Sequence, residues 1–430
     1  MSAEFSAPDA AVILDKLSNA PIAPGGYAHF INVGTDPLLD VLEDRYFQDQ
    51  LNRGLGAFKY LQAGYGGGKT QFILSLAERA QRNQVVTCRV DVGAECPFNS
   101  KLAIFKSVMA SFLPLGEGMV IDEDDRGIIV LMERWIDRKL KEHGVSKGDE
   151  VPDAVRAEVG RTFTPMMNGA ADTQMAAGLR EVGRRLLDHA CGADPTTEDT
   201  NLFSWVRGDK VSSTNLKRLG LAEPAKDENA FNRLNTTLKF LRTRLGYRGF
   251  FIAFDEGSRA MSFRRGSVKQ QQMVENLLDF INKTGDQQFA GVMFLYAAND
   301  EFRSEVIAKY EALENRIGSV AMSSGSPMVP FIDLDAVNTP QVLAQLGERL
   351  MDVFESACGV ELDRTIQRKN FEKLSAATYT LRLSPRTYVA LITRFLPGQV
   401  RAERLIGEAE AETFVQGNDP DRDDVEDEVA

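Results

Sequence analysis

The sequence predicts an α/β fold built on a parallel sheet, with a large helical insertion and a C-terminal helical lid. Two near-continuous apolar runs, 249–254 and 291–298, suit strands that are buried on both faces, as strands of a parallel sheet are. Segments with the apolar spacing of amphipathic helices lie before and after these runs. Strands that alternate with helices favour an α/β sheet with helices on both faces.

The expected elements follow from apolar spacing and from turn or capping residues at their ends. The part from about 114 to 246 has no clear strand, and its last helical pattern, 231–245, precedes Gly246 at a plausible C-cap. Two further helices begin where a capping residue is followed by proline. The expected elements are a helix over 36–51, strands over 58–62 and 85–90, a helix over 70–80, a strand over 328–332, and helices that begin at Thr339-Pro340 and Ser384-Pro385.

These elements divide the chain into six segments. The last of them is acidic, with seven acids and one base over 419–428, and we expect it to fray as a solvated end; a docking segment is the alternative. The segments are an N-terminal segment leading into the core (1–34), the first part of the core (35–113), the helical insertion (114–246), the second part of the core (247–335), the helical lid (336–400) and the acidic tail (401–430).

Composition excludes several classes of protein. The chain has 50 basic and 62 acidic residues in 430, so it is a poor candidate for coating nucleic acid by itself, although a local basic patch or a partner could still bring it to DNA. Its four cysteines form no CxxC pair and its three histidines lie at no metal-ligand spacing. It has no signal-peptide pattern and no apolar run long enough to cross a bilayer. We therefore expect a soluble cytoplasmic protein.

A glycine-rich stretch between a predicted strand and a predicted helix has the spacing of a phosphate-binding P-loop, GxxxxGK[ST], with Ala63 at the first glycine position. Glycines let backbone N–H groups point at phosphate oxygens, and the helix that follows adds the positive end of its dipole. Lys69 is expected to reach the β- and γ-phosphates of ATP, and Thr70 to place its hydroxyl on Mg²⁺. The expected nucleotide-binding residues are Gly64, Tyr65, Gly66, Gly67, Gly68, Lys69, Thr70 and Gln71.

An apolar strand that ends in two acids, Asp255 and Glu256, matches the Walker-B pattern. The chemistry needs a carboxylate at the carboxyl edge of the sheet, beside the P-loop, to hold Mg²⁺. Asp255 fits that role. Glu256 is then placed to polarise the attacking water as general base.

Three further polar residues are candidates for catalysis. Asn299 follows the strand over 292–298, where additional-strand P-loop ATPases carry a residue that orients water and senses the γ-phosphate; Asp300 is the alternative, and a simple turn is another. Arg316 precedes the next predicted strand, where oligomeric ATPases carry an arginine finger for a neighbouring subunit, unless it is a surface arginine. Arg386 lies in the first turn of a helix, where a cation is unfavourable without an anion, so it suits a phosphate.

The insertion separates Lys69 from Asp255 by 186 positions and is either a lid or packing element, or a contact for DNA or a partner. It offers Arg180, Arg184 and Arg185, but with acids nearby. The sequence leaves this choice open.

Taken together, the motifs resemble a known family. Residues 19–39 with Val33-Gly34-Thr35, 63–70, 250–256, 310–318 and 383–395 resemble the ATP-binding proteins of BREX phage-defence systems (BrxD-type), which look like AAA+-like ATPases related to the replication-origin initiator branch. The resemblance implies a P-loop NTPase (AAA+/ASCE-like) fold, ATP and Mg²⁺ as cofactors, and a large helicase-like partner. The family's Walker residues correspond to Lys69, Thr70, Asp255 and Glu256. Two departures are Ala63 and the 33 residues after position 397, too few for the winged-helix domain with which initiator ATPases grip DNA.

The sequence leaves three possible functions. The first is a Mg²⁺-dependent ATPase that assembles into homo-oligomers and couples nucleotide state, through Arg386 and the lid, to DNA or to a helicase-like partner of the defence system. The second is a nucleotide switch or scaffold that binds ATP, recruits partners and hardly turns over; Glu256 favours the first, because a switch does not need the base. The third is a non-enzymatic DNA-tethering module, which the net charge of −12 disfavours.

Overall fold

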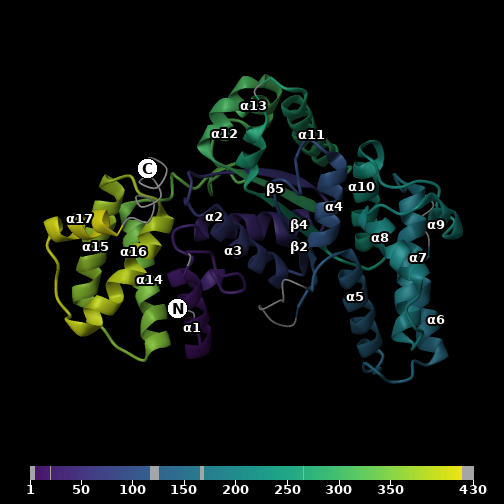
Figure 1. Ribbon diagram of the computed structural model, residues 1–430, viewed down its shortest axis with the longest axis horizontal. Helices are drawn as coiled ribbons and strands as arrows, with labels where there is room; N and C mark the ends of the chain where they lie inside the picture. The colour runs from purple at the N-terminus through teal and green to yellow at the C-terminus, as the bar shows by residue number, and fades with distance from the viewer. Residues whose placement is uncertain (1–4, 20, 117–124, 165–168, 265, 419–430) are drawn as a thin grey trace.

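The computed structural model describes residues 5–19, 21–116, 125–164, 169–264 and 266–418 of the chain (Figure 1). A central sheet with its covering helices lies between two helical regions. One helical region contains the segment between β3 and β4, and the other contains the C-terminal helices together with the first helix of the chain. The predicted α/β architecture is thus confirmed.

The described part of the chain forms a six-stranded sheet in the order β3-β2-β4-β5-β1-β6. All neighbouring strands are parallel except β3, which runs antiparallel to β2. The register pairs Asp91 with Asp255 and Gln62 with Ala298, so the carboxyl ends of four strands meet at one edge of the sheet. The strands are β1 Ala57–Gln62, β2 Val85–Asp91, β3 Phe112–Leu113, β4 Gly249–Asp255, β5 Val292–Ala298 and β6 Phe331–Asp333.

Both faces of the central strands are buried, as the apolar runs predict. In β4, Phe250, Ile252 and Phe254 belong to one hydrophobic core, whereas Phe251 and Ala253 belong to another on the opposite face. Alternating side chains of a strand point to opposite faces, so each face needs its own cover. The second face is covered by α2 Asp36–Leu42, η2 Glu43–Gln50 and α3 Lys69–Arg82; the first is covered by α4 Lys101–Ser111, α11 Val268–Gly285, α12 Asp300–Glu305, η4 Ile307–Lys309 and α13 Glu311–Ile317, and its core continues into the insertion.

The described part of the segment between β3 and β4 contains helices joined by turns and loops, and no strand. Its helices carry strong apolar stripes and extend the first core outward from the sheet. The last of them ends at Thr243, two residues before the predicted end, and Gly246 takes a positive φ of 76° in the turn that follows. The helices are α5 Ile128–Glu142, α6 Asp153–Thr162, α7 Thr173–Ala190, α8 Thr197–Arg207, α9 Ser213–Arg218 and α10 Asp227–Thr243.

The lid has a hydrophobic core of its own, and the N-terminal helix belongs to it. Ala10, Ile13 and Leu17 of α1 are buried against the lid helices, so the N-terminal segment does not simply lead into the sheet. From α1 the chain crosses to the sheet through η1 Ala28–Phe30. The lid helices are α14 Pro340–Cys358, α15 Arg364–Thr380, α16 Pro385–Arg401 and α17 Glu408–Gly417, and the predicted starts of α14 and α16 are confirmed.

Three sequence expectations need correction. Residues 36–51 form an α-helix that continues as a wider π-helix rather than one regular helix. The last strand covers 331–333 and not 328–332, because prolines at 327 and 330 donate no ladder hydrogen bond. The expected fraying tail is folded as far as residue 418: Ile406, Ala411 and Val415 are buried in the lid core. The acidic stretch over 419–430 lies outside the described residues.

A buried lysine in β1 gives the fold a testable pH dependence. The Lys59 Nζ atom donates to the Tyr46 hydroxyl at 2.6 Å and to the Val329 carbonyl at 2.8 Å, and burial lowers the pKa of this amine to about 7. The unfolded chain therefore binds more protons than the folded chain between pH 7 and the ordinary lysine value of 10.5, so the free energy of unfolding rises with pH in this window. The contribution has an upper limit of about 1.4 kcal/mol per pH unit.

Urea unfolding of the wild type and of Lys59→Met at pH 7 to 9.5 measures this contribution. We expect the stability of the wild type to increase relative to the variant as pH rises. The same pH dependence in both proteins would show that Lys59 is charged throughout the range.

Candidate functional site

The glycine-rich loop forms a tight turn that leads directly into α3. Its Gly67 N–H donates to the Gly64 carbonyl at 3.1 Å. Gly68 is the N-cap of α3 and has a φ of +93°, which residues other than glycine rarely adopt. Ala63, at the first glycine position of the motif, is buried, and its N–H donates to the carbonyl of Ala298 at the end of β5. The loop thus lies at the carboxyl edge of the sheet, with Lys69 and Thr70 in the first turn of α3.

The Lys69 side chain is folded onto the loop. Its Nζ atom donates to the carbonyls of Ala63 and Gly64, each at 2.9 Å. Burial lowers the pKa of the amine, while Asp255, Asp335 and other acids act in the opposite direction. The Lys69 amine is therefore bound to two carbonyl oxygens of the loop that the motif assigns to phosphate.

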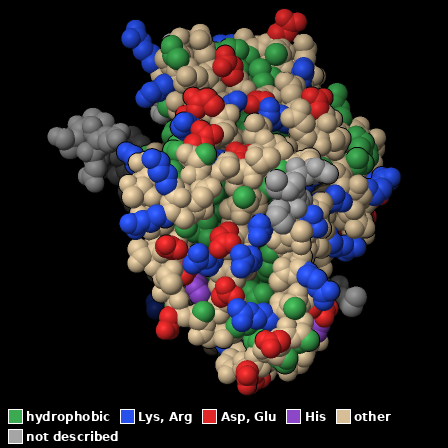
Figure 2. Space-filling view, turned by 90° about the vertical axis from the view of Figure 1, so that its right-hand side faces the viewer, with side chains coloured by type: hydrophobic (Ala, Val, Ile, Leu, Met, Phe, Trp, Pro, Cys, Tyr) green, Lys and Arg blue, Asp and Glu red, His purple; other side chains and the backbone are tan. Residues whose placement is uncertain are grey.

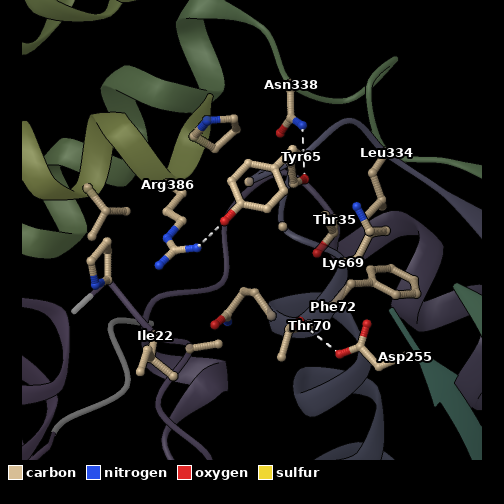
Figure 3. Close-up of a pocket in the computed structure, with 18 of the residues that line it drawn as sticks. Ile22, Thr35, Tyr65, Lys69, Thr70, Phe72, Asp255, Leu334, Asn338 and Arg386 are labelled. Carbon is tan, nitrogen blue, oxygen red and sulfur yellow. Dashed lines mark hydrogen bonds between the residues drawn. The ribbon is translucent and has the colours of Figure 1, made fainter. Parts of the chain in front are cut away.

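The two predicted metal ligands are in contact. The Thr70 hydroxyl donates to Asp255 Oδ2 at 2.8 Å, and the other carboxylate oxygen accepts the Glu256 N–H at 2.8 Å (Figure 3). Asp255 is only 2% exposed at the end of β4. Glu256 follows with a left-handed φ of 54° and forms an ion pair with Arg259.

The other predicted catalytic residues are placed in different ways. Asn299 lines the same cavity, but its side chain caps α12 by accepting the Phe302 N–H at 3.0 Å. Arg386 also lines it. Arg316 is exposed on α13, donates to Asn282 at 2.7 Å and is not among the lining residues, so the structure does not bring it to the site of its own chain.

Arg386 connects the lid to the loop. Its guanidinium donates to the Tyr65 hydroxyl at 3.1 Å, and its backbone N–H donates to the Gly66 carbonyl at 3.1 Å (Figure 3). Tyr65 is 75% exposed at the tip of the loop. The start of α16 thus contacts two consecutive residues of the glycine-rich turn.

Loop, sheet edge, N-terminal segment and lid enclose a cavity of about 560 Å³. One end is polar and holds the loop, Asp255, Glu256 and Asn299. The other end is lined by apolar side chains from the N-terminal segment and the lid: Leu17, Pro21, Ile22, Ala23, Ile31, Leu343, Leu346 and Val389. The cavity therefore combines polar residues of the loop and the sheet edge with an apolar recess.

The N-terminal part of this wall is fixed to α3. Gln71 donates to the Ala28 carbonyl at 2.7 Å, and Glu78 accepts the backbone N–H groups of Ala28 and His29 at 2.8 and 3.0 Å. Gln71 also lines the cavity, and its Oε1 atom is buried without a partner among the described residues. The helix that carries Lys69 and Thr70 thus also holds the wall beside them.

The donor atoms suit Mg²⁺. The ion prefers oxygen ligands and usually takes one or two from protein, the rest from phosphates and water. Thr70 Oγ1 and the Asp255 carboxylate are such a set. Within the described ranges no group of three or more His, Cys, Asp or Glu residues is arranged to hold an ion.

Sequence reasoning missed two polar residues that contact the loop. Both Asp335 oxygens accept the Gly64 N–H, at 3.1 and 3.0 Å, and Asn338 Nδ2 donates to the Gly67 carbonyl at 3.2 Å. Both residues follow β6 at the carboxyl edge of the sheet, where parallel α/β sheets bind their ligands. Their position after a predicted strand could therefore have identified them as candidates. The apolar recess was missed because its residues come from three separate segments without a common pattern.

Fold and cavity define a mixed α/β protein with a mostly parallel sheet, a glycine-rich loop at the sheet edge and an apolar recess beside it. The chain belongs to the BREX system ATP-binding protein BrxC/D family, whose model matches residues 7–392. ATP binding and a place in BREX antiviral defence, among the other components of that system, follow from the family. A search of curated proteins finds no match. Among the described helices none has both the length and the apolar character needed to cross a membrane.

Two glycines of the loop make a matched pair for testing the contact with the lid. A Cβ atom at Gly66, where φ is +67°, would lie 2.4 Å from Ser384 Oγ, whereas one at Gly64 would have no neighbour closer than 3.9 Å. We expect Gly66→Ala to weaken binding of a fluorescent ATP analogue about tenfold and to lower the melting temperature, because it adds backbone strain and a steric clash. Gly64→Ala should weaken binding less than Gly66→Ala does, because its Cβ atom meets no close neighbour. Equal affinities for the two variants would contradict the close approach of the lid.

Proposed function

We propose that the protein is a Mg²⁺-dependent ATPase of the AAA+-like, P-loop type. The proposal rests mainly on one observation: Lys69, Thr70 and Asp255 converge at one edge of the sheet, with a 2.8 Å hydrogen bond between the last two. The strand order supports it, because β5 separates β1, which leads into the loop, from β4, which ends in Asp255. That is the arrangement of additional-strand P-loop ATPases.

The cavity suggests how ATP lies. The Lys69 amine and backbone N–H groups of the loop other than those of Gly64 and Gly67, which donate to protein acceptors, suit the phosphates, and the helix dipole of α3 adds to their attraction. The apolar recess suits the base, which gains from leaving water. To reach a phosphate, the Lys69 amine exchanges its two carbonyl acceptors for phosphate oxygens. Mg²⁺, held by Thr70 and Asp255, would neutralise charge on the triphosphate.

Hydrolysis needs a base and an orienting group beside the phosphates. Glu256 follows the metal-binding acid and lines the cavity, which suits a general base. Its ion pair with Arg259 has to open before the carboxylate can accept a proton from water. Asn299, at the end of the neighbouring strand, is placed to orient that water once its side chain leaves the Phe302 N–H.

The proposed domain division separates the lid by its own hydrophobic core, whereas the sheet and the insertion share one core and are divided where the chain leaves and re-enters the sheet. Residues 35–113 and 247–335 form the ATPase core, 114–246 the insertion, and 336–400 the lid, to which α1 and α17 are added. Because Arg386 and the recess both come partly from the lid, ATP binding is proposed to shift the lid relative to the sheet. That movement would carry nucleotide state to partners.

The position of Arg316 leads us to propose that the protein forms homo-oligomers. Arg316 is exposed on α13 and does not line the cavity of its own chain, as expected of an arginine finger that acts on a neighbouring subunit. Light scattering with Mg²⁺ and a non-hydrolysable ATP analogue tests this: we expect a mass above that of one chain, and Arg316→Ala should keep ATP binding but lose phosphate release. A strict monomer would remove the finger.

DNA contact is proposed to go through an assembly or a partner such as a helicase-like BREX protein. Two of the three arginines considered in the insertion are paired with acids: Arg184 and Arg185 both pair with Glu181, and Arg185 also pairs with Asp199. Figure 2, which faces the side of the molecule that carries the insertion, shows basic and acidic side chains interspersed. A surface of mixed charge suits a protein partner better than a phosphate backbone.

The alternative is a nucleotide switch that binds ATP and hardly turns over. Two variants separate it from the enzyme. Lys69→Ala should weaken ATP affinity at least about tenfold through loss of charged hydrogen bonds. Glu256→Gln should keep affinity and lower phosphate release by about 10² to 10⁴. Glu275→Gln, an exposed glutamate on α11, is the matched control and should behave as wild type.

These variants are compared in ATP titrations and in phosphate-release assays, with and without double-stranded DNA and other BREX components. If the wild type binds ATP but releases no phosphate under any of these conditions, the enzyme is excluded and the switch is left.

A further inference from the structure

The segment between β6 and α14 holds the outer side of the glycine-rich loop. Asp335 accepts the Gly64 N–H with both carboxylate oxygens, at 3.1 and 3.0 Å. Three residues later, Asn338 donates to the Gly67 carbonyl at 3.2 Å (Figure 3). Gly64 and Gly67 are the two ends of the turn that the loop makes, joined by their own 3.1 Å hydrogen bond. One short segment therefore fixes both ends of the turn.

This segment is itself well anchored. The Leu334 N–H donates to the Gln62 carbonyl of β1 at 2.9 Å, and the N–H groups of Val337 and Asn338 both donate to the Leu334 carbonyl, at 3.0 and 3.2 Å. The Asp335 N–H is held by Asp333 at 3.0 Å. The segment is thus a closed turn attached to the sheet, and it continues directly into the first helix of the lid.

An acid at this position has an electrostatic cost for an anion site. Asp335 and Lys69 lie close enough to influence each other, and partial burial raises the pKa of Asp335. A carboxylate beside bound triphosphate repels it. If the side chain at position 335 served only to attract the triphosphate, an acid would be unfavourable there. If it serves to orient a backbone N–H, a carboxylate is favourable because it is a strong hydrogen-bond acceptor.

We propose that Asp335 and Asn338 are positioning residues that hold the glycine-rich loop in its phosphate-binding shape and tie it to the start of the lid. Neither residue is required to touch the nucleotide. Asp335 sets the orientation of the first peptide of the turn and Asn338 that of the last. If α14 moves with the lid, the segment between β6 and α14 therefore changes the conformation of the loop directly. This effect adds to any that bound ATP transmits. The inference rests on the proposed binding of ATP at this loop.

Three variants separate positioning from charge. Asp335→Ala removes both acceptor and charge, Asp335→Asn keeps an acceptor oxygen without the charge, and Asn338→Ala removes the donor. Asp286→Ala is the matched control, since it removes an exposed acid beyond the end of α11, outside the cavity. Asn338→Asp, which places an acceptor against the Gly67 carbonyl, is a second variant at the other end of the turn.

Affinity for a non-hydrolysable ATP analogue with Mg²⁺ is measured for the full chain, with the melting temperature of each variant. We expect about tenfold weaker binding for Asp335→Ala and for Asn338→Ala, from loss of one hydrogen bond that orients the loop. Asp335→Asn should bind at least as tightly as wild type, because repulsion is removed and the acceptor is kept. Asp286→Ala should be unchanged.

Hydrogen exchange of the nucleotide-free protein gives a readout that does not need ATP. Amides over 64–68 should exchange faster in Asp335→Ala and Asn338→Ala, but not in Asp335→Asn. The inference is overturned if Asp335→Ala and Asn338→Ala match the control in both measurements, or if Asp335→Asn weakens binding as much as Asp335→Ala. A wild type that binds no ATP contradicts the proposed function instead, and the exchange data then test the loop contacts alone.

Discussion

The hydrogen bond between Thr70 and Asp255 joins two parts of the chain that the insertion separates by more than a hundred residues, and the site depends on it. It exists because β1, β5 and β4 are parallel and in register, so that the loop after β1 and the acid that ends β4 arrive at the same edge. Burial of both faces of these strands fixes that register, since a slip by one residue would reverse every side chain. The insertion can be large because it leaves and re-enters the sheet without disturbing these strands.

The lid and the segment that leads into it both contact the loop. Arg386 of the lid reaches Tyr65 and Gly66, while Asp335 and Asn338, between β6 and α14, reach Gly64 and Gly67. On the other side of the cavity, the N-terminal segment runs from the lid core to α3, where Gln71 and Glu78 hold it: Gln71 Nε2 donates to Ala28 O, and Glu78 Oε1 and Oε2 accept from Ala28 N and His29 N. Lid and core are thus linked through both walls of the cavity. A ligand that contacts both lid and core would gain or lose contacts if the lid moved, which is the requirement for the proposed coupled movement.

Local patterns could predict the fold and the central residues. The buried strands, the P-loop spacing and the two acids after β4 each rest on a short stretch of sequence with a direct physical meaning. The apolar recess, Asp335 and Asn338 could not be assigned in this way, because their role depends on which distant segments fold together. The tail was predicted wrongly as far as residue 418, because its overall polarity hid three buried side chains at helical spacing, Ile406, Ala411 and Val415. Arg316 stays a prediction, since its proposed partner is another subunit.

We propose that the loop, Lys69, Thr70 and Asp255 together bind one triphosphate. A structure of the protein with Mg²⁺ and a non-hydrolysable ATP analogue is the sharpest test. We expect terminal phosphates within hydrogen-bond distance of the Lys69 amine, with Mg²⁺ beside Thr70 and Asp255 and the base in the apolar recess. A nucleotide bound elsewhere, or one whose phosphates leave Lys69 on the carbonyls of Ala63 and Gly64, would contradict it.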